Sequence, residues 1–339
     1  MSCCFSKKCF ARGHREDAYK VTDEVPNAEG DEAPKYSWDR RDKVDPSEYT
    51  IRDIHTTSVK KTGKDGGPLQ IENCTDATIM FLHTTSQVII DDCRHCTIVL
   101  GPTQGSVFIR DSTNCTVLTA CQQLRTRDCT SIQIGILCST EPIVENSMDI
   151  HFYSLPMKYS NLQEQMHSVG LRPYTNRVTS AYDFSPVGTG GKINFTVTAE
   201  ALKLTDSQNQ ILTVNGIITK PTDDDFLPRF EKRSDEDPVY LYVLGKSKPM
   251  DVLEARAKKI CHSIYKCGMK ITATYDVDRS IQEPNFLPLF GPTCERMILI
   301  EAIGPLEKFE CDEEFDFMSD TDMEKLSVQL SQMKCTKSE

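Results

Sequence analysis

One short pattern of apolar and polar positions recurs along residues 69–147. Each copy places an apolar or small residue before polar ones and ends on a small residue, and these small residues lie 19, 19 and 17 residues apart. The four copies end Ile71-Glu72-Asn73-Cys74, Ile90-Asp91-Asp92-Cys93, Ile109-Arg110-Asp111-Ser112 and Thr126-Arg127-Asp128-Cys129. A nearly constant period of this length predicts a solenoid in which each repeat is one coil stacked on the last.

Alternation within each copy separates an inner set of side chains from an outer set. The mostly apolar inner pairs are Leu69/Ile71, Val88/Ile90, Val107/Ile109 and Leu124/Thr126. The outer pairs are Gln70/Glu72, Ile89/Asp91, Phe108/Arg110 and Arg125/Arg127. The pattern therefore predicts a mainly β, helix-like stack of coils whose fourth coil presents two arginines to solvent.

The rest of the chain divides by composition and period. Residues 1–34 are predicted to be a flexible tail, and residues 35–186 to be the β domain. Within the β domain, each coil is expected to contain a second strand, near 78–82, 97–100 and 116–118, and an amphipathic stretch lies near 162–169. Residues 187–237 are rich in Gly, Thr, Asp and Pro without a sustained period, which predicts a linker. Residues 238–339 are predicted to be a small α/β domain. The elements expected in it are a strand at 239–244, a helix from near Pro249, strands at 269–275 and 297–302, and a helix at 323–333.

Composition narrows the classes of function. The chain has 339 residues and a formal net charge of −11, and this acidity argues against generic nucleic-acid binding. No apolar run is long enough for a transmembrane helix, and the N-terminus lacks the apolar core of a signal peptide. Five of the 15 cysteines (Cys74, Cys93, Cys96, Cys115 and Cys129) stand at repeat positions, so we expect reduced, intracellular thiols that act as small buried apolar groups.

Motifs for self-contained chemistry are weak. Gly245-Lys246-Ser247 lacks the glycine that a phosphate-binding loop needs five residues earlier, where Tyr240 stands. Cys93-Arg94-His95-Cys96 has no second ligand pair at zinc-site spacing. The seven histidines are scattered without a partner nucleophile, so we expect neither a metal site nor a complete catalytic site in this chain.

The repeat register gathers one candidate patch around the two arginines. Gln122-Gln123 stands at the same repeat position as Gly105-Ser106 one coil earlier, and Glu145 of the next coil lies beside Arg127. Small residues, amide donors, two guanidiniums and a carboxylate thus converge, and such a patch could offer an arginine to a phosphate. Solvated surface charge is the plainer interpretation of the same arginines.

Two segments at this patch resemble a known family. Ala120-Cys121-Gln122-Gln123-Leu124-Arg125 and Pro142-Ile143-Val144-Glu145 resemble the signature of the tubulin-binding cofactor C domain, a right-handed parallel β-helix. Segments 36–39, 43–46, 100–102, 105–108 and 183–186 are similar to a branch of that family. In this branch a C-terminal α/β domain, ferredoxin-like and similar to nucleoside-diphosphate kinase, follows the β-helix.

The resemblance implies a GTPase-activating protein for an Arf-like small GTPase in its GTP-bound state, in trafficking of lipidated proteins to the ciliary or plasma membrane. It implies that Arg125 is an arginine finger supported by Gln122 and Glu145. The positions implied to lie near the nucleotide are Gly105, Ser106, Gln122, Gln123, Leu124 and Arg125. Arg127 and Phe184 are implied at the partner interface. GTP and magnesium would come with the partner, so no cofactor of its own is expected.

Both ends of the chain depart from the family pattern. Members commonly begin Met-Gly-Cys, whereas this chain begins Met1-Ser2-Cys3-Cys4, and without a glycine at position 2 myristoylation is excluded. Cys3 and Cys4 remain candidates for palmitoylation. The resemblance implies a location at the cytoplasmic face of the plasma membrane, at the ciliary base or in the cilium, with a cytoplasmic pool. His262 is the one histidine after residue 238, so we expect a non-catalytic binding module there.

Two other functions stay open at this point. The shared β-helix also allows a tubulin-folding cofactor, with tubulin as the partner. A scaffold that binds the GTP-loaded GTPase without accelerating hydrolysis is the second alternative. The intact set of Gln122, Arg125 and Glu145 favours catalysis over the scaffold.

Overall fold

The computed structural model describes most of the chain after residue 45. The described residues are 46–185, 194–198, 200–220, 227–231, 239–245, 250–278, 295–305, 308–311 and 316–317. The tail with Cys3 and Cys4 and the helix predicted at 323–333 lie outside them. Short 3-10 helices occur at Pro46–Tyr49 and Val178–Ser180.

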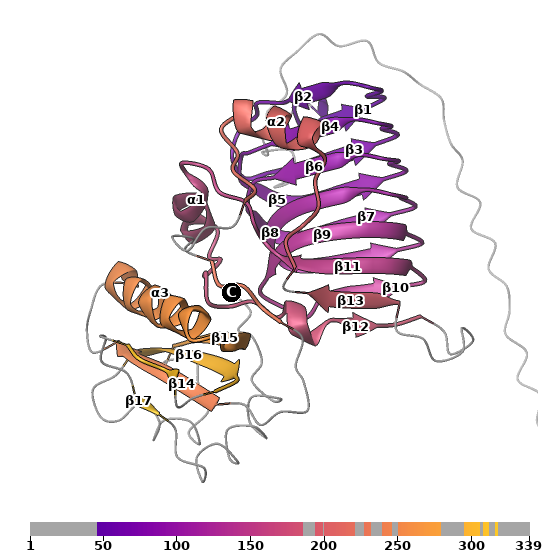
Figure 1. Cartoon of the computed structure of the whole chain (residues 1–339). Helices are drawn as coiled ribbons and strands as arrows, with labels where there is room; N and C mark the ends of the chain where they lie inside the picture. The colour runs from indigo at the N-terminus through magenta and orange to yellow at the C-terminus, as the bar shows by residue number, and fades with distance from the viewer. Residues whose placement is uncertain are drawn as a thin grey trace, which may run out of the picture. The chain divides into compact units, whose positions relative to one another are not determined.

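Residues 50–154 form a parallel β-helix, and each coil contributes a strand to each of two ladders (Figure 1). The first ladder contains β1 (Thr50–Arg52), β3 (Gly67–Glu72), β5 (Thr85–Asp91), β7 (Thr103–Arg110), the second half of β8 (Thr116–Arg127), β10 (Ile143–Glu145) and β12 (Tyr182–Asp183). The second contains β2 (Ser58–Lys60), β4 (Thr78–Phe81), β6 (Thr97–Leu100), the first half of β8, β9 (Thr130–Cys138), β11 (Met148–Ser154) and β13 (Phe195–Thr198). The predicted β-helix is confirmed, and it begins one coil earlier than the strands predicted from residue 68.

The recurring pattern of the sequence is the corner of a coil. Directly after each outer pair, one residue has left-handed backbone angles, with φ between 46° and 56°. These residues are Asp53, Asn73, Asp92, Asp111, Asp128 and Asn146. Aspartate and asparagine tolerate this conformation better than other non-glycine residues because their short polar side chains bond to nearby backbone. The constant Asp or Asn of the pattern is therefore a requirement of the turn.

After every corner but the first, at Asp53, a small buried residue follows, and it ties the corner to the strand before it. The thiol of Cys129 donates to the carbonyl of Arg127 at 3.2 Å, and the hydroxyl of Ser147 donates to the carbonyl of Glu145 at 2.8 Å. Burial raises the pKa of the Cys129 thiol to about 11. Cys74, Cys93, Cys96, Cys115 and Cys129 are all buried free thiols, as predicted.

The two ladders differ in what covers their outer surfaces. On the second ladder Met80, Val99 and Leu118 point outward yet are buried, because they pack with residues of helices α1 (Leu162–Ser168) and α2 (Asp206–Val214). This explains why β4 and β6 are apolar at successive positions instead of alternating. In the first ladder the outward side chains of β3, β5, β7 and β8 are half-buried or exposed.

The segment predicted to be a linker contributes two ordered elements. Strand β13 adds to the second ladder beside β11, where the hydroxyl of Thr196 lies 2.8 Å from Nδ1 of His151. Helix α2 begins with a capping box, in which the side chains and backbone N–H groups of Thr205 and Gln208 bond reciprocally. Both elements lie against the β-helix. The Thr-x-x-Gln spacing is a local signal for the start of α2, whereas β13 has no comparable signal.

The described C-terminal elements are four strands and one helix. They are β14 (Val239–Gly245), α3 (Met250–Lys266), β15 (Lys270–Asp278), β16 (Arg296–Ile303) and β17 (Asp316–Phe317), with the strands antiparallel in the order β15-β16-β14-β17. Leu253, Ala257, Ile260 and Ile264 form the buried stripe of α3, as their spacing predicts. The helix ends before Gly268, whose φ of 84° is typical of a helix C-terminus. None of the helices in the described part of the chain has the length and apolarity to span a bilayer.

Adjacent isoleucines in β5 test the inner and outer sets. Ile90→Ala should lower the free energy of unfolding by about 2–5 kcal/mol, because the side chain is fully buried and its removal leaves a cavity. Ile89→Ala, one residue earlier on the half-buried outer face, should cost about 1 kcal/mol or less. Urea denaturation of both variants measures the difference, and equal costs would contradict the inner and outer assignment.

Candidate functional site

The outward side chains of the first ladder form two rows that cross the coils. Because neighbouring strands pair in parallel register, each outer residue lies beside its counterpart on the next coil. One row is Gln70, Ile89, Phe108, Arg125, Ile143 and Tyr182, and the other is Glu72, Asp91, Arg110, Arg127 and Glu145. Three arginines thus stand within two coils, and we call Phe108, Arg110, Arg125, Arg127 and Glu145 the arginine patch.

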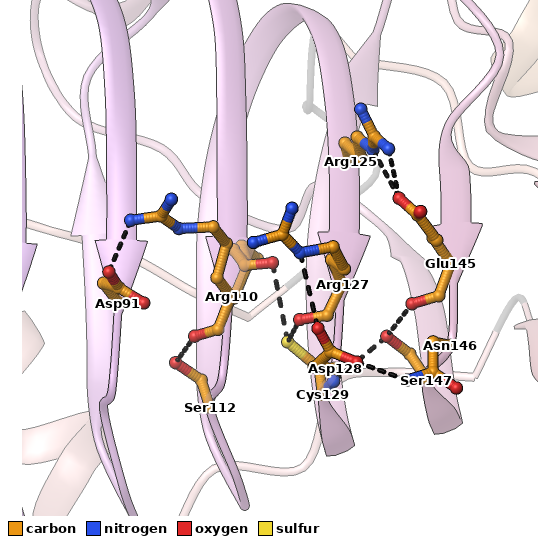
Figure 2. A network of polar contacts seen from close by, with 11 residues as sticks. Asp91, Arg110, Ser112, Arg125, Arg127, Asp128, Cys129, Glu145, Asn146 and Ser147 are labelled. Carbon is orange, nitrogen blue, oxygen red and sulfur yellow. Dashed lines mark hydrogen bonds and ion pairs between the residues drawn. The ribbon is translucent and has the colours of Figure 1, made fainter.

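Arg125 is the most exposed member of the patch with a fixed partner. Its side chain is 47% exposed, and both Nε and Nη2 donate to Oε2 of Glu145, with Nε at 2.9 Å. Figure 2 shows the two side chains pointing toward each other from neighbouring strands. Glu145 is paired with Arg127 in the strand register, as predicted, but its side chain reaches diagonally to Arg125. The carboxylate therefore holds the direction of the more exposed guanidinium.

The two neighbouring arginines have separate carboxylate partners. Arg110 binds Asp91 one coil earlier, and Nε of Arg127 lies 3.4 Å from Oδ2 of Asp128 at the following corner (Figure 2). Asp128 also accepts a hydrogen bond from the amide of Asn146. Each guanidinium of the arginine patch thus has its own counter-charge, which limits the repulsion among the three.

The backbone beneath the patch is fixed by the corners. The N–H of Asp111 donates to the carbonyl of Arg127 at 3.1 Å, and the N–H of Asp128 donates to the carbonyl of Glu145 at 3.3 Å. Within the hydrophobic core below, Thr126 and Val144 are fully buried between the outward residues. Arg125 and Glu145 therefore project from strands that have little freedom to shift.

Amide and small side chains lie just before the arginines, as predicted. Ser106 pairs in register with Gln123, and the extra residue of β7 at this point makes a bulge that includes Gly105. Gln122 is half-buried and Gln123 is exposed. The carbonyl of Gln122 accepts from the N–H and the hydroxyl of Thr140 at 3.0 and 2.9 Å, which fixes the strand at this position.

Leu124 differs from the other residues predicted to lie near a nucleotide. Its side chain points into the core and is 1% exposed, so it offers no side chain to this surface. Alternation along β8 already predicts that Leu124 is in the inner set. Leu124 is among the predicted nucleotide-proximal positions only because it lies within the family motif. The remaining predicted members of the set lie on the outer side or at the bulge.

An exposed aromatic pair lies at the far edge of the first ladder. Phe184 is 60% and Tyr182 55% exposed, and their rings make an edge contact with centroids 4.6 Å apart. Burial raises the pKa of the Asp183 carboxyl between them, but hydrogen bonds from Ser185 and Asn194 outweigh burial and hold the pKa below its usual value. The pairing of Val144 with Asp183 places Phe184 next to Glu145. The sequence singled out Phe184 but gave no signal for Tyr182, which depends on this strand pairing.

The arrangement can present a cation to another molecule. Among the described residues, no three His, Cys, Asp or Glu side chains are grouped to hold a metal ion. The arginine patch offers one half-exposed guanidinium with a fixed direction, next to amides and an aromatic edge. Such a surface suits an anionic group carried by another molecule.

Comparison with known proteins defines the class of the fold. Residues 66–184, which include the whole arginine patch, match the family model described as "Tubulin binding cofactor C". On this match, residues 66–184 are a tubulin-binding cofactor C domain. The solved structure of "Tubulin Binding Cofactor C from Leishmania major" matches with a TM-score of 0.32 and 24% identity over 40% of this chain and 87% of that one.

Full-length relatives place the chain more closely. Protein XRP2 of Xenopus laevis is 33% identical over 319 residues, which cover 91% of this chain and 86% of that protein. Protein XRP2 of Homo sapiens is 32% identical over 311 residues, which cover 86% of this chain and 84% of that protein. The chain belongs to the XRP2 family, the branch that the sequence resemblance indicated.

Gly105 should be required where the coils approach most closely at the site. A Cβ atom at this position would lie 2.6 Å from the carbonyl oxygen of Ser86 on the preceding coil, so backbone would have to move. Gly105→Ala should lower the free energy of unfolding by about 1–3 kcal/mol, as overpacking does. Ser106→Ala is the neighbouring control and should change it by about 0.5 kcal/mol or less. Chemical denaturation compares them, and equal stability of Gly105→Ala and wild type would refute the close approach.

Proposed function

We propose that this protein is a GTPase-activating protein for an Arf-like small GTPase, and that Arg125 is the arginine finger it inserts in trans. The observation that carries the proposal is the half-exposed Arg125 guanidinium, directed by Glu145 and projecting from a rigid strand of the β-helix. Membership in the XRP2 family and the cofactor C signature around Arg125 support the same assignment.

The chemistry of GTP hydrolysis explains why one arginine suffices. As the bond to the γ-phosphoryl group breaks, negative charge spreads over the phosphoryl and leaving-group oxygens. A guanidinium supplied by another protein neutralises it and is worth about 10³–10⁵ in rate. That factor corresponds to roughly 4–7 kcal/mol of the activation barrier. GTP and magnesium belong to the partner in this scheme, and this chain needs no cofactor.

The other residues of the site have supporting roles in the proposal. Glu145 orients the finger, and the half-buried Gln122, three residues before Arg125 on the same strand, supplies an amide to the partner's active site. The partner's nucleotide lies next to the small residues Gly105 and Ser106 and the amide side chain of Gln123. Arg127 and the exposed Phe184 contact the body of the GTPase. The biological role proposed is trafficking of lipidated proteins to the ciliary or plasma membrane.

Two other functions are distinguishable from this one. A scaffold would bind the GTP-loaded GTPase through the same surface without changing the rate of hydrolysis. A tubulin-folding cofactor would bind tubulin, as the printed name of the matching family model suggests for that family. Single-turnover hydrolysis by a panel of Arf-like GTPases, together with a tubulin-binding assay on the full chain, separates the three.

Arg125→Ala should abolish most of the stimulation while leaving the fold intact. We expect stimulated single-turnover hydrolysis at saturating activator to fall by about 10³ or more. The melting temperature should barely change because the side chain leaves no core cavity. Arg125→Lys should restore little, since an ammonium lacks the planar fork of a guanidinium.

Arg110→Ala is the matched control for charge. It removes a guanidinium from the same patch, but one that is bound to Asp91 and lies a coil earlier. Its rate should stay within about tenfold of wild type. Near-wild-type hydrolysis with Arg125→Ala would replace the proposed activator by the scaffold, provided that binding to the GTP-loaded partner persists.

We also propose that the N-terminus anchors the protein by palmitoylation of Cys3 and Cys4, with Lys7 and Lys8 as a second, electrostatic signal. Acyl-exchange labelling of the protein expressed in animal cells should detect thioesters in wild type and lose them in the Cys3→Ser, Cys4→Ser double variant. Cys267→Ser should keep the label. An unlabelled wild type refutes the anchor and leaves the proposed GTPase activation untouched.

A further inference from the structure

The aromatic ring of Phe108 lies at the centre of the arginine patch. The guanidinium carbons of Arg125, Arg127 and Arg110 lie 5.3, 5.4 and 5.5 Å from its centroid, each within the range of a cation–π contact. Phe108 pairs in register with Arg125 on the next strand. Nothing in the alternation of the sequence marks this residue beyond its outward direction.

We propose that Phe108 is a positioning residue for Arg125: its ring and the Glu145 carboxylate together hold the guanidinium in the orientation in which it enters the partner's nucleotide site. This inference rests on the proposed function and names a further residue of the same site. Phe108 itself is not proposed to touch the nucleotide.

The two restraints act on different parts of the guanidinium. Glu145 accepts from Nε and Nη2, so it occupies one edge of the planar group. The electron-rich face of the Phe108 ring attracts the cation as a whole and restrains its motion about the bonds that the carboxylate leaves free. Among the described residues none accepts a hydrogen bond from Nη1, which leaves that nitrogen open to an incoming anion. Figure 2 shows one terminal nitrogen of Arg125 directed away from Glu145.

Restraint matters here because an exposed arginine is otherwise mobile. Its long side chain has many rotamers, and an ordered guanidinium must overcome the entropy of the others. A single half-exposed ion pair contributes little against this cost in water. A ring on the neighbouring strand adds a second contact without using any of the donors that the phosphate needs.

The two flanking arginines lie about as near the ring as Arg125 does, and each has an ion pair of its own. Arg110 pairs with Asp91 on the earlier coil, and Arg127 with Asp128 at the corner. The Glu145 carboxylate is the contact that distinguishes Arg125 from the other two. Their positive charge also disfavours any Arg125 rotamer that turns back toward them, and so favours the outward rotamer bound to Glu145.

The test compares Phe108→Leu, which keeps an apolar side chain without the ring, with Phe108→Tyr, which keeps the ring. Ile89→Ala is the matched control, because Ile89 stands in the same outward row one coil earlier. Single-turnover hydrolysis by a GTP-loaded Arf-like GTPase is measured over a range of full-length activator. These data separate the maximal rate constant from the half-saturating concentration.

Phe108→Leu should lower the maximal rate constant about three- to fivefold, or about 0.6–1 kcal/mol, with a half-saturating concentration within twofold of wild type. Phe108→Tyr and Ile89→Ala should match wild type. The melting temperature of all three variants should stay within a few degrees of wild type. Loss of affinity with an unchanged maximal rate constant would overturn the proposal, because Phe108 would then be an ordinary contact residue.

A second measurement needs no partner and so separates this inference from the proposed function. The Nε–H signal of Arg125 in a ¹H–¹⁵N spectrum of the full chain is identified by its absence in Arg125→Ala. In wild type and Phe108→Tyr we expect a slowly exchanging signal shifted by the ring. In Phe108→Leu we expect it to move toward the position of a free arginine and to exchange faster with solvent.

An Arg125 Nε–H signal that is the same in Phe108→Leu and wild type would overturn the positioning role even if GTPase activation is real. If Arg125→Ala activates as well as wild type, the proposed function fails. Phe108 then has no finger to position, whatever the spectrum shows. A shifted spectrum together with a lowered maximal rate constant supports both.

Discussion

The left-handed corner, repeated once per coil, is the constraint on which the rest of this β-helix depends. An aspartate or asparagine with positive φ turns the chain directly after each outward pair, and its N–H reaches the carbonyl of the next coil. Because side chains alternate along a strand, a shift of one residue at a corner would exchange inner and outer faces for the whole coil. Arg125 faces solvent and Thr126 the core because the corner at Asp128 fixes where the strand ends.

Features that follow from the repeated corners and the alternation along each strand could be predicted from the sequence. Features that depend on contacts between distant segments could not. The period, the outer pairs and the stripe of α3 repeat at fixed spacing, so they could be predicted. The first coil at Thr50–Lys60 carries a similar run, Ile51-Arg52-Asp53-Ile54, but an isoleucine replaces the usual small residue and weakens the match. Strand β13 and helix α2 pack against the β-helix, and the segment that contains them shows no sustained period.

The candidate site shows the same division. The register predicted that Arg125, Arg127 and Glu145 would gather on adjacent coils, because strand pairing in a β-helix is parallel and nearly in register. It could not predict that Glu145 would reach diagonally to Arg125, or that one ring would lie near three guanidiniums. Those outcomes depend on rotamers of long side chains, for which backbone register sets the distance but not the direction. Helices α1 and α2 cover the second ladder, so the first ladder is left as the open face. No local sequence pattern predicts which of the two ladders will be covered.

The modest strength of the Arg125–Glu145 pair suits the proposed finger better than a buried pair would. Exposed ion pairs are worth about 0.2–1 kcal/mol, so the carboxylate directs the arginine without a large cost when the guanidinium turns to a phosphate. Breaking a fully buried pair would cost about 3–5 kcal/mol, which is comparable with the gain expected from the finger itself. With 47% of its side chain exposed, Arg125 forms an exposed ion pair of the weaker kind. Direction then has to come from several weak contacts on a stiff backbone, and the corners of the β-helix supply that stiffness.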